Sequence, residues 1–107
     1  MSDSQRINYL QQCIKEQMTS KDLIRALCSP SSFITSVLDN APMIGQYKPI
    51  EAAAIRSSYI WDPIKASMDL LIVVYDISLY HPEILEAFLS ALDKSGLINV
   101  RKEVFGD

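Results

Sequence analysis

Histidine and glycine are scarce in this chain of 107 residues, which contains one histidine and three glycines. A single histidine cannot form a zincin-type helix, and the sequence holds neither a glycine-rich phosphate loop nor a nucleophile elbow. His81 directly precedes Pro82 at an expected helix start, where an exposed or capping role is simpler than a catalytic one. We therefore expect a protein that is not an enzyme and has no metal or cofactor.

Cysteine is also rare, and its spacing excludes the common metal and redox motifs. Cys13 and Cys28 lie fifteen residues apart, without the close pairs of structural zinc sites or redox centres. We expect two buried free thiols, which pack as small apolar side chains. An antiparallel pair of helices would let the two thiols approach, but a cytosolic chain would keep them reduced.

No hydrophobic segment is long enough to cross a membrane. The longest unbroken apolar run, Leu70 to Tyr75, is far shorter than a bilayer span, and the polar start MSDSQRINYL lacks a signal peptide. Glycine and proline together number only eight, with no low-complexity run, which indicates a folded chain. We expect one domain over residues 1–107, a cytoplasmic location and no membrane partner.

The stretch from Asp62 to Tyr80 has the features around which the remaining segments should pack. Its apolar centre is rich in β-forming residues and could be a buried strand, but a strand needs partners, and only 98–105 looks extended. Asp62 followed by Pro63 is a helix N-cap with the favoured first-turn proline. We therefore favour a central helix over residues 63–80.

Apolar residues recur at helical spacing through most of the chain. The pattern predicts an all-α, compact single-domain bundle of five or six helices around the buried central helix. We expect a loop over 41–47 and an extended arm or short strand in the tail, 97–107. The other helices are expected at 4–17, 20–27, 30–40, 49–61 and 82–95. Their predicted inward residues include Ile14, Phe33, Ile34, Val37, Leu38, Ile55, Tyr59, Ile60, Ile84, Leu85, Phe88, Leu89 and Leu92.

Residues 19–40 resemble a helix-turn-helix in the spacing of their apolar residues. The resemblance implies a small DNA-binding regulator that dimerises through the central helix. However, Cys28 stands at the usual turn glycine, and the segment in the position of the recognition helix, 31–40, has no lysine or arginine. Phosphate neutralisation by basic side chains supplies most DNA affinity, so nucleic acid is an unlikely partner and a plain helical hairpin is favoured.

Negative charge is concentrated in one part of the sequence. Between 57 and 93 the chain has six carboxylates and a single basic residue, Lys65. Asp62, Asp69 and Asp76 are spaced by seven, so on a helix they form a narrow stripe. Such a stripe either keeps an apolar helix in water or binds a basic partner, with tyrosines as anchors.

We expect the second role, in a non-enzymatic protein-binding domain. A small acidic domain of this kind is what an inhibitor or immunity-type protein needs to cover the basic site of a nuclease-like toxin, because sites that cleave nucleic acid are positively charged. The predicted partner-binding residues are Asp62, Asp69, Tyr75, Asp76, Tyr80 and Glu83.

Overall fold

The computed structural model describes residues 5, 8, 11–12, 14–16 and 30–94, and its fold is all-α. The described residues before position 17 are helical, as predicted for the first helix. Five further helices follow, and no residue in the described ranges belongs to a strand. These helices are α3 (Pro30–Asn40), α4 (Met43–Tyr47), α5 (Pro49–Ser58), α6 (Pro63–Ser78) and α7 (Glu83–Lys94).

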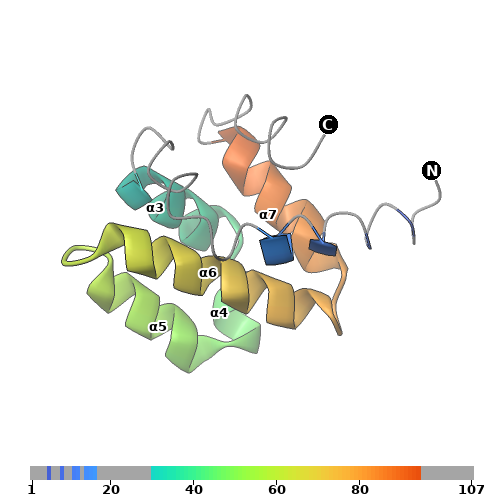
Figure 1. Cartoon of the computed structure of the whole chain (residues 1–107), viewed down its shortest axis with the longest axis horizontal. Coiled ribbons are helices and arrows are strands. Elements are labelled where there is room, and N and C mark those ends of the chain that lie inside the picture. Colours follow the sequence, from blue (N-terminus) through green and yellow to red (C-terminus); the bar gives the residue numbers. More distant parts are fainter. Residues whose placement is uncertain (1–4, 6–7, 9–10, 13, 17–29, 95–107) are drawn as a thin grey trace.

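Helix α6 is the central element of the bundle, as predicted, and the strand interpretation of its apolar run is wrong. It crosses the middle of the molecule and contacts α3, α4, α5 and α7 (Figure 1). Half of its sixteen residues are buried, including Leu70, Leu71 and Val74. The helix therefore buries one side in the core and leaves its opposite side at the surface.

The sequence around Pro63 explains where α6 begins. The carboxylate of Asp62 accepts a hydrogen bond from the backbone N–H of Lys65 at 3.1 Å. This N–H lies in the first turn, where backbone donors have no acceptor within the helix, so the side chain of Asp62 supplies one. Pro63 follows in the first turn, where its missing N–H has no cost. The helix ends at Ser78, two residues earlier than predicted, and Leu79 and Tyr80 form a turn.

The core lies between α6 and the two helices on one side of it, α3 and α7. The rings of Phe33 and Phe88 meet edge to face, with their centroids 6.1 Å apart. Two hydroxyl groups are buried on α6, and both are satisfied by the helix itself. Ser67 donates to the carbonyl of Pro63 and Ser78 to that of Tyr75, each at 2.7 Å. The predicted inward residues of α3 and α7 that the structure describes are buried: Phe33, Ile34, Val37, Leu38, Ile84, Leu85, Phe88 and Leu89.

The loop predicted at 41–47 is wrong, because residues 43–47 form α4. Pro42 immediately precedes this helix, a position where proline is tolerated. Ile44 is completely buried and anchors the short helix to the core. The helix stops before Lys48, whose non-helical backbone (φ −136°, ψ 65°) leads directly to Pro49 and α5.

A second difference concerns Ile60, predicted to face the core and found 70% exposed. Helix α5 ends at Ser58, and residues 59–61 form a turn that leaves the helical repeat before Ile60. Ile55 is buried and Tyr59 packs at the edge of the core, as predicted. The predictions for both cysteines, the helix at 20–27, the side chain of Leu92 and the tail fall outside the described residues.

Candidate functional site: the exposed side of α6

The exposed side of α6 carries four side chains within an arc of about 60°, given the helical rotation of about 100° per residue. They are Lys65, Asp69, Ile72 and Asp76, here called the α6 face. Ile72 is 43% exposed although it is a large aliphatic residue. The α6 face thus presents an apolar side chain between two carboxylates, one turn from each.

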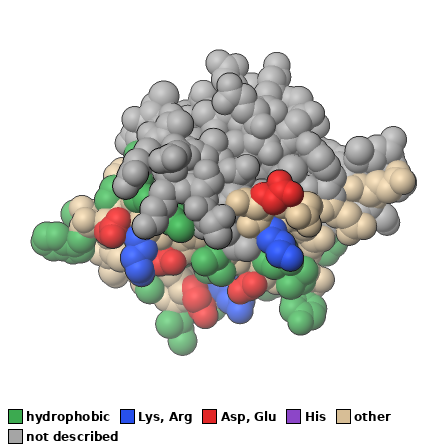
Figure 2. Space-filling model, viewed as in Figure 1, with side chains coloured by type: hydrophobic (Ala, Val, Ile, Leu, Met, Phe, Trp, Pro, Cys, Tyr) green, Lys and Arg blue, Asp and Glu red, His purple; other side chains and the backbone are tan. Residues whose placement is uncertain are grey.

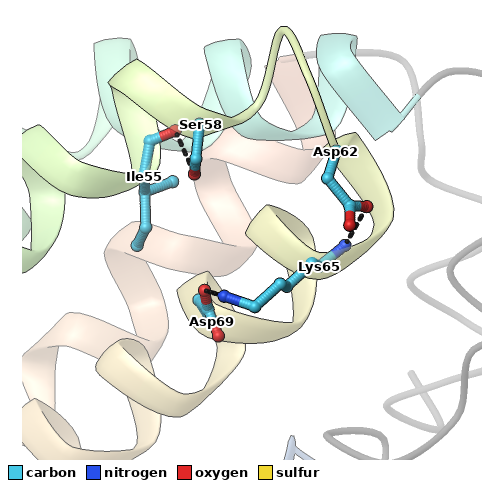
Figure 3. A network of polar contacts seen from close by, with 5 residues as sticks. All are labelled: Ile55, Ser58, Asp62, Lys65 and Asp69. Atoms are coloured by element: carbon cyan, nitrogen blue, oxygen red, sulfur yellow. Dashed lines mark hydrogen bonds and ion pairs between the residues drawn. The ribbon is translucent and has the colours of Figure 1, made fainter.

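Lys65 partly neutralises the acidic stripe predicted from the sequence. Its ammonium group lies 3.3 Å from the carboxylate of Asp69, one turn further along the helix (Figure 3). The lysine side chain is 72% exposed, so the pair contributes little to stability. Asp62 also points to this end of the helix, where its carboxylate caps the backbone of Lys65. Positive and negative side chains are accordingly interspersed across the lower half of the molecule in Figure 2.

A shallow groove of about 350 Å³ runs between α5 and α6 beside the α6 face. Helix α5 contributes the short side chains of Ala54 and Ser58 to it, together with Glu51. Helix α6 contributes Lys65, Asp69 and Ile72. Carboxylates from both helices, together with the ammonium group of Lys65, therefore flank an exposed apolar surface, a composition suited to a partner with basic side chains and an apolar anchor.

A second hollow, of about 410 Å³, lies at the carboxyl end of α6. Its walls include Asp76, Tyr80 and Lys48, so it continues the α6 face beyond the end of the helix. The ring of Tyr47 stacks on that of His81 at its edge, with centroids 4.1 Å apart and planes 10° from parallel. This stack gives the hollow a fixed aromatic wall.

The structure brings some of the predicted partner-binding residues together and separates others. Asp69 and Asp76 share the α6 face, and Tyr80, 82% exposed, lines the same hollow as Asp76. Tyr75 is about 100° further round the helix from Asp76 and packs half-buried against the core. Glu83 belongs to the first turn of α7, with its carboxylate 3.6 Å from the His81 imidazole.

The turn between α5 and α6 carries a surface feature that the sequence analysis missed. Trp61 is 87% exposed and its neighbour Ile60 is 70% exposed. Hydrophobic side chains project at the left edge of Figure 2, where Figure 1 places this turn. No local pattern indicated this exposure, because both residues lie within the predicted helix 49–61 and Ile60 was expected to face the core.

Other kinds of site find little support in the part of the chain that the structure describes. No three histidine, cysteine, aspartate or glutamate side chains gather there as metal ligands. None of its helices combines the length and the apolar character that crossing a bilayer requires. Helix α3, which stands where a recognition helix would be, buries its apolar side and has no basic residue.

Comparison with known proteins gives no relative from which a function can be transferred. No family model, curated protein or solved structure matches this chain. The functional argument therefore depends on the surface of the molecule alone.

Proposed function

We propose that this chain is a non-enzymatic protein-binding domain that uses the α6 face to cover a positively charged site on another protein. The observation that carries the proposal is the grouping of Asp69 and Asp76 on one exposed side of α6, with Ile72 between them. Carboxylates at this spacing attract and orient a basic partner, while exposed apolar and aromatic side chains supply desolvated contact.

Tyr80 and Trp61 extend this surface beyond the two ends of α6. Both are more than four-fifths exposed, and aromatic side chains of this kind are the usual anchors of protein interfaces. A partner that contacts both ends would span the length of α6, which is about 24 Å for sixteen residues at 1.5 Å each.

The class of protein that best fits this surface is an inhibitor of immunity type, whose acidic side covers the basic site of a nuclease-like toxin. Nucleic-acid-cleaving sites are positively charged, so carboxylates on a compact domain both accelerate encounter and block the site. The single basic residue on the α6 face, Lys65, would face an acidic or neutral position of the partner. The α6 face is therefore expected to discriminate between basic partners.

A charge reversal tests the proposal. The variant Asp69→Lys/Asp76→Lys should lose at least tenfold in affinity for a basic partner protein, mainly through slower association, because like charges then oppose each other. The matched control, Glu16→Lys/Glu86→Lys, changes the net charge equally on exposed positions outside α6. Partners are obtained from the products of genes adjacent to this one and measured by titration calorimetry. Equal affinity for both variants would reject the α6 face as the binding surface.

A further inference from the structure

The exposed positions of α6 and its ends follow a coiled-coil spacing. Steps of three and four residues separate Asp62, Lys65, Asp69, Ile72, Asp76 and Leu79, which are exposed or half-exposed. Helices in a coiled coil contact each other through residues at this spacing. On α6 these six residues, here called the seam, face away from the core. Other residues of α6 form the core, so the fold does not depend on the seam.

The chemistry of this seam is self-complementary in the antiparallel direction. Lys65 lies as far before the midpoint of the Leu70–Leu71 pair as Asp76 lies after it. A two-fold axis at that midpoint would therefore place each Lys65 opposite Asp76 of the second copy, twice in the dimer. The parallel arrangement would instead put each carboxylate opposite itself.

The same two-fold axis would also bring apolar side chains of the two copies together. Ile72 lies near the midpoint, so two copies of this half-exposed side chain would meet beside the axis. Trp61 and Tyr80 are exposed in the turns that precede and follow α6, so each end of the antiparallel contact would hold the indole of one copy and the phenol of the other. The contact would thereby cover Ile72 and bring these two rings to its ends.

Neither the remaining carboxylate near the axis nor the neighbouring helix prevents this arrangement. Asp69 would lie opposite Ile72 of the second copy, and its charge is already compensated by Lys65 of its own chain at 3.3 Å. Helix α5 lines the groove beside the seam with Ala54 and Ser58, whose short side chains leave space there, and with Glu51. Lys65 would then lie between two carboxylates, one from each copy.

We propose that two copies of this chain form an antiparallel dimer through α6, held by reciprocal Lys65–Asp76 ion pairs around Ile72. The contact of two sixteen-residue helices is smaller than a standard interface, which buries about 800 Å² per partner, so the dimer is weak and reversible. It covers the α6 face, so a basic partner competes with the second copy for the same surface. The inference uses that face but does not depend on the proposed partner.

Sedimentation of the purified full chain, from about 10 µM to about 1 mM, measures this association in the range typical of weak interfaces. Lys65→Asp and Asp76→Lys should each weaken dimerisation by roughly tenfold or more, since symmetry makes each substitution act twice. An equimolar mixture of the two variants should associate again, because the carboxylate introduced at position 65 of one chain then faces the ammonium group introduced at position 76 of the other. Lys94→Asp, on α7 and away from the seam, should dimerise like the unaltered chain.

Circular dichroism melts check that each variant is folded, and Ile72→Glu provides a second test by placing two carboxylates beside the axis. A chain that stays monomeric at the highest concentration, single variants that dimerise normally, or a mixture that associates no better than its components would each overturn the proposal. Binding to a basic partner is measured separately, at concentrations where the chain is monomeric. An unaltered chain that binds the partner but never dimerises rejects only the dimer, and one that dimerises but does not bind a basic partner rejects only the proposed function.

Discussion

The imidazole ring of His81 stacks on the phenol ring of Tyr47, with centroids 4.1 Å apart and planes 10° from parallel. Tyr47 is the last residue of α4, whereas His81 lies in the turn between α6 and α7. The backbone of His81 is held at both sides, since its N–H donates to Ile77 at 2.8 Å and its carbonyl accepts from Ile84 at 3.0 Å. The stack therefore fastens the short helix α4 to a fixed point of the bundle.

Removal of this stack should loosen α4. We expect Tyr47→Ala to lower the free energy of unfolding by about 1 kcal/mol, the scale of an aromatic pair at a partly exposed site. Tyr47→Phe keeps the ring and should retain most of the stability. Urea unfolding measures both, with Tyr80→Ala as the control because that ring is 82% exposed. An equal loss for Tyr47→Ala and Tyr80→Ala would mean that the stack adds nothing.

The N-cap at Asp62 should contribute measurably to the stability of α6. Asp62→Ala removes the acceptor of the Lys65 N–H and should cost about 1 kcal/mol in unfolding free energy. Asp62→Asn preserves a capping oxygen and should cost only a few tenths of that. Thermal and urea melts of the three proteins measure the difference. If alanine and asparagine were equally destabilising, the contribution of Asp62 would come from its charge and not from the cap.

The buried and exposed sides of α6 should differ sharply in their sensitivity to truncation. Leu71→Ala should destabilise by about 2 to 4 kcal/mol, with Val74→Ala near the lower limit, because both side chains are buried and leave cavities. Ile60→Ala, at a site 70% exposed just before the helix, should change stability by less than about 0.5 kcal/mol. Urea unfolding measures all three. Comparable losses at Ile60 and Leu71 would contradict the burial pattern of the fold.

The sequence predicts α6 well because several local signals agree there. An N-cap, a first-turn proline and apolar residues at helical spacing all indicate a helix that begins at Pro63, and the structure confirms it. The prediction was wrong at 41–47, where a loop was expected. Burial of Ile44 by the rest of the chain stabilises a helix of only five residues there, a tertiary effect that local patterns do not contain.

The surface was less predictable than the core. The spacing of Asp69 and Asp76 fixes their common side once α6 is a helix, but which side faces water depends on how α3, α5 and α7 pack around it. Tyr75 directly precedes Asp76, so on the helix it lies about 100° away from the α6 face and packs half-buried against the core. The pairing of Lys65 with Asp69 was accessible from their spacing of four residues.

Trp61 provides a direct readout of the proposed dimer, since it is the only tryptophan in the chain. At low concentration its indole should emit as a hydrated ring and be fully open to acrylamide quenching, because it is 87% exposed. As concentration rises, packing against Tyr80 of the second copy should shift the emission to shorter wavelength and reduce quenching. Lys65→Asp should keep the dilute signal throughout, and Lys94→Asp should follow the unaltered chain. Dimerisation by sedimentation without any change at Trp61 would show that the two copies meet through a different surface or register.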